Sequence, residues 1–323
     1  MNRQQRREYY RTYSAFQIKQ ERYWLPKIYK ALQANNDAFA TYLIKNGTRD
    51  ALAMIDRIVT IDPIINLLQL LYKVVGLRRG RIIQRSIKEQ VKISRKAATL
   101  GFNEQLTKEI QRFFELFLLN KSVIPITNTQ KEAIRQVLAK GVEEGLGVEQ
   151  LARKITGMPY TRKQARVVVR TETVRASNAA AEITAQQSEY LMEKEWISAN
   201  DDRVRRPPKS HYDHWDLDGQ VVPGDRPFFS GGEELMFPGD PNGSAGNVIQ
   251  CRCTVAYTIV VDANGRLIKK PSGSSPARYS SVPKLPVTVP DVGVNSDITI
   301  IHPSQSNITQ IITIGIKAAF FEK

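Results

Sequence analysis

The hydrophobic pattern of this 323-residue chain changes near residue 190, and this change limits the folds that the chain can adopt. Before it, apolar residues recur at helical spacing, most clearly between residues 64 and 75. Asp62-Pro63 precedes that run, and the pair suits a helix start because Asp caps free backbone N–H groups and Pro fits the first turn. After residue 190, short β-branched runs alternate with segments rich in Pro, Gly and Asp. The sequence therefore predicts an α+β protein with a helical N-terminal region and a small β-rich part.

Turn signals and composition divide the chain further. Residues 122–128 resemble a connector, and Thr129 with Glu132 has the spacing of a capping box at the start of a new helix. The predicted helices cover about 64–100, 104–119, 130–144, 148–156 and 162–187, with Gly76 and Gly80 as weak points in the first. The predicted strands cover 193–198 and 248–261, and an apolar stretch at 298–316 follows a Ser/Pro-rich linker at 271–290. We expect three parts, at residues 1–125, 126–262 and 263–323.

The excess of positive charge lies in the first part of the chain. The protein has 47 Lys and Arg against 32 Asp and Glu, a formal charge of +15. Residues 1–125 hold 23 basic and 10 acidic residues, a net of +13, and the remaining residues have a net of +2. This imbalance favours polyanionic partners. The basic start lacks the apolar stretch of a secretory signal, two cysteines cannot build a disulfide framework, and residues 58–75 are too polar to span a bilayer. We therefore expect a reducing compartment and no membrane.

Six cations recur at steps of three and four residues in the first predicted helix. They are Arg78, Arg81, Arg85, Lys88, Lys92 and Arg95. On a helix these steps form one stripe, which can follow a phosphate backbone without reading base sequence. A solvated helix face with no ligand is the equally weighted alternative. The aromatic residues interleaved with basic ones nearby can stack on bases or, more commonly, pack in a core; they are Tyr9, Tyr10, Tyr13, Phe16 and Tyr23.

Two histidines and two cysteines form a candidate zinc set. His211 and His214 lie in a Pro-rich loop, and Cys251 and Cys253 lie on a predicted strand. Neutral imidazole and thiolate suit zinc, but the Cys-x-Cys spacing departs from the usual pair, and strand geometry separates its side chains by about 6–7 Å. Two buried thiols and polar loop histidines are the alternative. A metal-dependent or transferase-like enzyme would need an open metal position and a base, and neither His-Glu-x-x-His nor His-x-x-Glu-His occurs.

An ordered series of motifs is more specific than any of its parts. In chain order they are Arg170-Thr-Glu-Thr, Lys194-Glu-Trp-Ile-Ser-Ala, Asp202-Arg-Val-Arg, His214, Leu217-Asp-Gly-Gln, Phe228, Leu235-Met-Phe-Pro-Gly-Asp and Cys251-Arg-Cys. The series resembles the phage Mu F-like head morphogenesis domain, which is related to the minor head proteins of tailed bacteriophages. The resemblance covers about residues 127–261. It departs from the family pattern at residues 206–213, which lengthen the stretch before His214; the Asp-Gly that follows favours His214 over His211.

The resemblance implies a low-copy minor head protein in the capsid interior of the virion, and in the host cytoplasm during assembly. The implied partners are the portal protein, other capsid or scaffold proteins, and DNA bound without sequence preference. A delivered toxin carried by the Mu F-like part is a further alternative. The family pattern marks Arg170, Glu172, Trp196, Asp202, Arg205, His214, Asp218, Gly219, Cys251, Arg252 and Cys253, with no catalytic assignment. We expect Arg170, Glu172, Asp202 and Arg205 to form structural ion pairs across helix and loop, and anion or DNA binding by the two arginines is the alternative.

Overall fold

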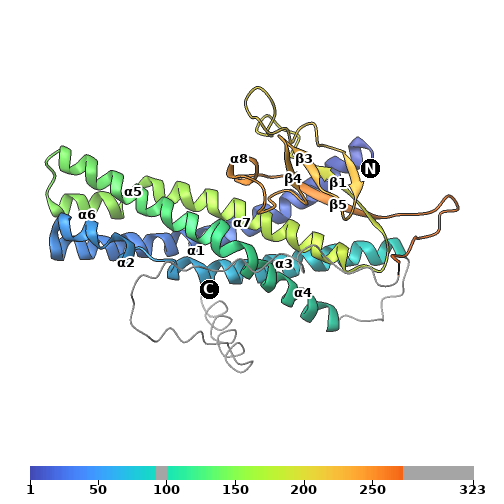
Figure 1. The fold of residues 1–323 in the computed structure, drawn as a ribbon, viewed down its shortest axis with the longest axis horizontal. Helices are drawn as coiled ribbons and strands as arrows, with labels where there is room; N and C mark the ends of the chain where they lie inside the picture. Colours follow the sequence, from blue (N-terminus) through green and yellow to red (C-terminus); the bar gives the residue numbers. More distant parts are fainter. Residues whose placement is uncertain (92–99, 272–323) are drawn as a thin grey trace. The chain divides into compact units, whose positions relative to one another are not determined.

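The computed structural model describes residues 1–91 and 100–271, and it confirms the α+β class (Figure 1). Its long helical elements are α1 (Arg3–Ala53), α3 (Asp62–Val91), α4 (Leu100–Phe113), the π-helix η1 (Phe114–Val123), α5 (Ile124–Glu143) and α7 (Pro159–Gln186). Shorter helices are α2 (Ile55–Ile58), α6 (Val148–Thr156) and α8 (Ala245–Val248). The strands are β1 (Met192–Ile197), β2 (Val221–Pro223), β3 (Phe228–Ser230), β4 (Glu233–Leu235) and β5 (Thr254–Ile259). The predicted apolar stretch at 298–316 lies outside the described residues, as do Lys92 and Arg95.

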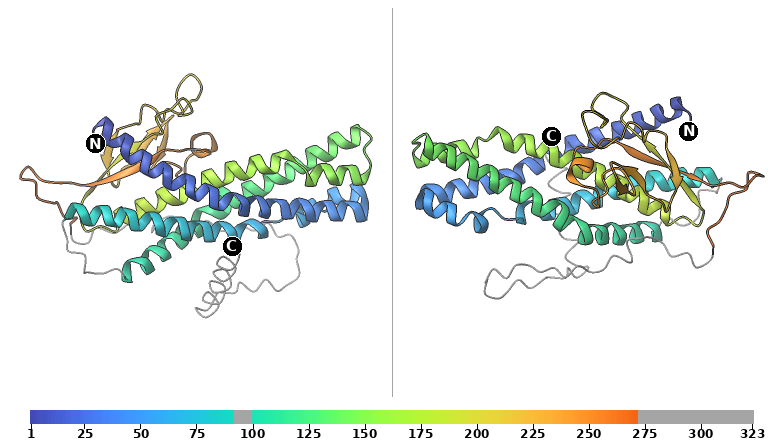
Figure 2. Two further views of the ribbon diagram at one scale, coloured as in Figure 1. Left: turned by 180° about the vertical axis from the view of Figure 1, so that it is seen from behind. Right: turned by 45° about the horizontal axis from the view of Figure 1, so that its top comes forward.

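Helix α7 is the central helix of the described part. Every residue from Thr171 to Ala185 is buried, and α1 and α3 run alongside the helix (Figure 2). Its small side chains permit close approach by α3: a Cβ atom at Gly80 would lie 2.9 Å from Thr184 Oγ1 and 2.3 Å from a methyl carbon of Leu106 in α4. The two glycines that the sequence marked as weak points, Gly76 and Gly80, are therefore the places where three helices meet, and α3 continues through both.

The expected connector at residues 122–128 is wrong. Helical backbone continues from α4 through η1 into α5, so no loop separates them. Pro125 occupies the first turn of α5, where a missing N–H costs little, and the wide π-helical turn precedes it. Thr129 donates to the carbonyl of Pro125 at 2.7 Å, so it is an interior residue of the helix and not a cap. The expected boundary at residues 125 and 126 falls within this helical run, and separate folding of the two parts stays a prediction.

Two small antiparallel sheets follow α7. One has the strand order β2-β1-β5, and the other is the β3-β4 hairpin. The predicted strand at 193–198 corresponds to β1, in which Trp196 pairs with Val255 of β5. The predicted strand at 248–261 is too long, because β5 begins only at Thr254 and α8 ends at Val248. The Cys251 to Cys253 segment therefore precedes the strand, which frees its side chains from strict alternation.

The N-terminal helices pack directly on the first sheet. Tyr9 of α1 donates to the carbonyl of Val255 at 3.0 Å. Gln90 of α3 accepts a hydrogen bond from the Ile259 N–H at 2.9 Å and donates to the Tyr257 carbonyl at 3.3 Å, so its amide bonds the backbone along the edge strand β5. One hydrophobic core extends from Trp24 in α1 to β5, and a second core joins α1 to α5 and α6 at the other end of the helices.

The stretch Ile55–Val91 is long and apolar enough, by length and composition alone, to cross a membrane. In the structure a third of its most apolar window is buried, and Leu68, Leu71 and Val75 contribute to the main core. This alternation of buried and exposed residues is typical of a helix that covers the core of a globular protein.

Candidate functional site

Four of the six predicted DNA-binding cations lie within α3. Arg78, Arg81 and Arg85 are exposed, and Lys88 is half-buried. The buried residues Arg79, Gly80 and Ile83 alternate with them at helical spacing, so the core-facing and the charged sides of the helix are distinct. Arg78 also donates a long hydrogen bond, 3.4 Å, to Gln20 of α1. We call Arg78, Arg81, Arg85 and Lys88 the basic face of α3.

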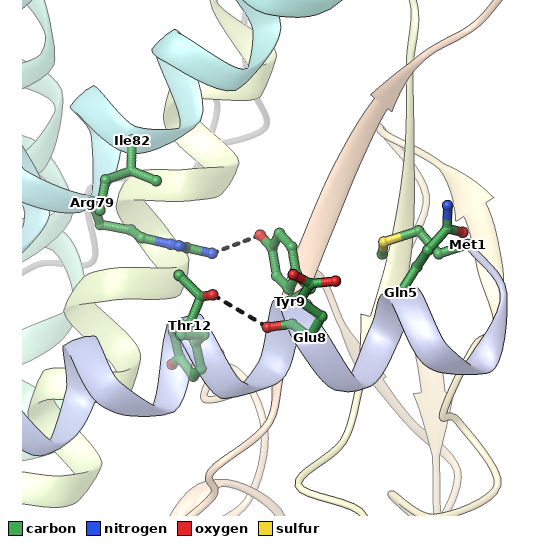
Figure 3. Close-up of a pocket in the computed structure, with 8 residues that line it drawn as sticks. Met1, Gln5, Glu8, Tyr9, Thr12, Arg79 and Ile82 are labelled. Atoms are coloured by element: carbon green, nitrogen blue, oxygen red, sulfur yellow. Dashed lines mark hydrogen bonds between the residues drawn. The ribbon is translucent and has the colours of Figure 1, made fainter.

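A groove between the start of α1 and α3 places aromatic residues against a buried cation (Figure 3). Arg79, only 3% exposed, donates from Nη2 to the Tyr9 hydroxyl at 2.7 Å. Its guanidinium carbon lies 5.6 Å from the Tyr9 ring centre and 5.1 Å from that of Tyr13, within cation–π range. Tyr13 is itself 1% exposed. These two tyrosines are packing partners of Arg79, so base stacking by Tyr13 is ruled out in this arrangement.

The structure brings three of the four candidate metal ligands together. Nδ1 of His214 lies 3.6 Å from the sulfur of Cys251 and 3.8 Å from that of Cys253, and the three ligand atoms all lie within 4.8 Å of one another. All three side chains are buried. His211 lies elsewhere, exposed, with Nε2 3.2 Å from the Gly231 carbonyl oxygen. The four-ligand prediction is therefore wrong for His211, and we call His214, Cys251 and Cys253 the sulfur–imidazole cluster.

The two thiols of this cluster share a hydrogen bond, and their pKa values shift in opposite directions. A hydrogen bond from Cys253 holds the pKa of Cys251 well below its usual range although burial opposes this. The same contact with Cys251, together with burial, raises the pKa of Cys253 well above its usual range.

A second layer of polar contacts fixes His214. Its Nε2 lies 2.6 Å from Oδ1 of Asn247 in α8. The amide nitrogen of Asn247 donates to Glu233 at 2.9 Å, which sets the orientation of the amide and leaves Oδ1 as an acceptor for the imidazole. His214 therefore carries its proton on Nε2 and turns the Nδ1 lone pair toward the sulfur atoms. Sequence reasoning missed Asn247, because no spacing rule connects it to His214.

Arg205 connects the histidine loop to the cysteine segment. Its carbonyl accepts from the His214 N–H at 2.9 Å, while its guanidinium donates to the carbonyls of Gly246, at 2.7 Å, and Ile249. Helix α7 also contacts the cysteine segment, because its Asn178 donates to the Cys253 carbonyl at 3.1 Å. The cluster is thus positioned by elements that lie far apart in sequence.

The four residues expected to pair with one another have other partners. Arg170 forms a two-bond ion pair with Glu21 of α1, at 3.1 and 3.0 Å. Glu172 is buried in α7, where it accepts from Tyr72 at 2.7 Å and pairs with Arg175 at 3.3 Å. Asp202 lies on the surface beside Arg206, and Arg205 bonds the carbonyls named above. Structural bonds are present at all four, but the expected mutual pairing is wrong because α1, absent from that prediction, supplies one partner.

The remaining motif residues surround the cluster. Trp196 is fully buried and packs edge-on against the His214 ring, with 5.1 Å between ring centres. Asp218 accepts from the Ser198 N–H at 2.8 Å, and Gly219 donates to the Trp196 carbonyl at 2.8 Å with a φ of +87° that favours glycine. Arg252 pairs with Asp201 through two hydrogen bonds. The contacts of Asp218 and Gly219 join the far end of the loop after β1 back to the end of β1 itself.

Comparison with known proteins agrees with this architecture. Residues 132–256 match the family model described as Phage Mu protein F like protein. The curated Uncharacterized protein YqbB of Bacillus subtilis (strain 168) is 30% identical over 131 residues, 40% of this chain and 42% of that protein. The chain therefore matches less than half the length of this relative. No solved structure matches. The matched segment runs from α5 into β5 and contains the whole sulfur–imidazole cluster, so residues 132–256 form a domain that is similar to the Phage Mu protein F like family.

Proposed function

We propose that this chain is a minor head protein of a tailed phage, which takes part in head morphogenesis, lies in the capsid interior and binds packaged DNA without sequence preference. The single observation that carries the DNA contact is the basic face of α3, Arg78, Arg81, Arg85 and Lys88, on the side of the helix opposite the core. The Phage Mu F-like domain carries the assignment to the head.

Charge and exposure support a phosphate ligand. Cations that stand one helical turn apart can contact successive phosphates, and each contact gains affinity through the release of counterions. Arginine and lysine heads directed at phosphates carry no base information, so binding is independent of sequence. Glu89 is the acidic residue beside this face within α3, and the net charge of +13 on residues 1–125 reinforces the local field.

The test is the salt dependence of DNA binding. In a triple variant, Arg81→Gln, Arg85→Gln and Lys88→Gln, we expect weaker binding to unrelated duplexes alike. The slope of log K against log salt should flatten by about 0.9 for each phosphate that the variant no longer binds. The matched control changes three exposed cations at the other end of the helices, Lys140→Gln, Arg153→Gln and Lys154→Gln, with the same change in net charge. Equal slopes in the two variants would reject the basic face as the DNA-binding surface.

Association with the portal is the second half of the proposal. The extended α1, which is kinked at Gly47 and packs on both the Phage Mu F-like domain and α3, offers a long surface to a ring-shaped partner. In purified procapsids and virions carrying a labelled chain, we expect label inside the head and chemical cross-links from α1 lysines to the portal. Particles that lack the chain, or cross-links confined to the outer shell, would overturn this assignment.

A further inference from the structure

We propose that His214, Cys251 and Cys253 bind one zinc ion that ties the loop after β1 to the segment before β5. This inference is independent of the DNA and portal contacts proposed above. The ligands are Nδ1 of His214 and the two thiolates, which leave the fourth position of a tetrahedral ion to a small ligand such as water. The three side chains are only 1–2% exposed, so the ion would be shielded from substrates, and we assign it a structural role.

The separations between the imidazole nitrogen and each sulfur fit such an ion. With Zn–S bonds of about 2.3 Å and Zn–N bonds of about 2.0 Å, tetrahedral coordination separates a nitrogen from a sulfur ligand by roughly 3.5 Å. The observed separations from His214 Nδ1 are 3.6 Å to Cys251 and 3.8 Å to Cys253. The three ligand atoms lie within 4.8 Å of one another, so the two sulfur atoms have to move closer together, to roughly 3.8 Å, when an ion binds.

The imidazole already presents the correct atom. Asn247 accepts the Nε2 proton of His214 at 2.6 Å, and Glu233 holds Asn247 in the orientation that makes this possible. A metal-binding histidine usually donates its other ring N–H to a carbonyl or carboxylate oxygen in this way, which fixes the tautomer and the ring angle. Arg205 adds a second restraint, since it joins the backbone at His214 to the carbonyls before Cys251.

Charge balance selects a divalent ion. Two thiolates and a neutral imidazole carry a charge of −2, which a divalent cation neutralises in this buried position, where uncompensated charge is costly. Thiolate and imidazole ligands also favour zinc over magnesium or calcium, which prefer oxygen. A Cys–His nucleophile uses the same residue types, but it needs access for a substrate, and this cluster is enclosed.

The first experiment measures metal in the full chain purified without added metal or chelator. We expect about one zinc per chain in the unchanged protein, and at least a tenfold loss in Cys251→Ser and in Cys253→Ser. The matched control is His211→Ala, which removes the histidine that lies outside the cluster and should keep the zinc. Less than about 0.1 zinc per chain in the unchanged protein, or zinc that disappears with His211, would overturn the site.

A second experiment does not depend on the folding of the cysteine variants. Co²⁺ added to the reduced, unchanged protein, after its zinc has been removed with a chelator, should give a sulfur-to-cobalt charge-transfer band that saturates at one ion per chain and disappears on addition of Zn²⁺. Because that band requires thiolate ligands, a titration without it would reject the proposal even where the variants fail to fold.

Discussion

Arg252 and Asp201 form a close two-bond ion pair next to the sulfur–imidazole cluster, with Nη1–Oδ2 and Nη2–Oδ1 distances of 2.5 and 2.6 Å. The pair fixes the side chain of Arg252, the residue between the two cysteines, against Asp201. Its hydrogen bonds lower the pKa of Asp201 well below its usual range. The ion pair therefore links the turn after β1 to the Cys251 to Cys253 segment that precedes β5.

Removing the charge of Asp201 should loosen this junction. We expect Asp201→Asn to lower the free energy of unfolding by about 1 kcal/mol, a modest value because the carboxylate is partly screened by solvent. Urea unfolding at neutral pH measures it. The neighbouring Asp202→Asn is the matched control, since its side chain is 93% exposed and its pair with Arg206 is long, so it should change little. Equal effects of the two would contradict the importance of the Asp201–Arg252 pair.

The buried Lys194 should be intolerant of replacement by an apolar residue. Its Nζ lies 3.3 Å from Glu182, and both side chains are fully buried. Lys194→Met leaves the Glu182 carboxylate without its cation, so we expect the free energy of unfolding to fall by about 3–5 kcal/mol. Adding Glu182→Gln should recover part of it, because a neutral amide needs no counter-charge. The exposed pair of Lys269 with Glu189 supplies the comparison Lys269→Met, for which little change is expected. A double variant less stable than Lys194→Met alone would refute this explanation.

Gly80 should resist substitution because of packing rather than backbone conformation. An alanine Cβ there would lie 2.3 Å from a Leu106 methyl carbon, so that side chain has to move. We expect Gly80→Ala to cost about 1–2 kcal/mol net, since the overpacking cost exceeds the helix-propensity gain of about 1 kcal/mol. Ser86→Ala, on the exposed side of the same helix, should be neutral or slightly stabilising. Thermal unfolding of the two variants compares them directly, and a more stable Gly80→Ala protein would show that the helices can separate freely.

Stability should depend on pH through Glu233. Burial opposes its charge, but hydrogen bonds from Asn247, Ser244 and Tyr212 prevail and lower the pKa of Glu233 to about 2. A carboxylate whose pKa is lowered on folding stabilises the protein above its unfolded pKa, and this contribution disappears as pH falls from about 4.5 to about 2. We therefore expect Glu233→Gln to be less stable at pH 7 and to approach the unchanged protein by pH 3, as followed by urea unfolding. Asp225→Asn, at an exposed carboxylate, should show no such convergence.

Much of the helical architecture follows from local sequence. The run from Ile64 to Val75 and the cations from Arg78 to Lys88 obey the 3.6-residue period, so both sides of α3 can be predicted without any knowledge of its neighbours. The strand around Trp196 is equally local. Residues 122–128 are the exception, because their Pro and polar residues are typical of a loop, whereas the buried Val123 and Thr127 hold the segment in a helix.

The candidate sites also have features that the sequence predicts and features that only the folded structure shows. The residue order alone predicts the basic face of α3, the series of Phage Mu F-like motifs and the residue types of a zinc site, because helical spacing, motif order and residue identity are all present in the linear sequence. Three further facts come from the folded chain: His214 and not His211 meets the cysteines, Asn247 fixes the tautomer of His214, and Arg79 is buried against Tyr9. They depend on contacts between residues 33 to 70 positions apart, which form when loops close and helices pack, and local spacing carries no information about either.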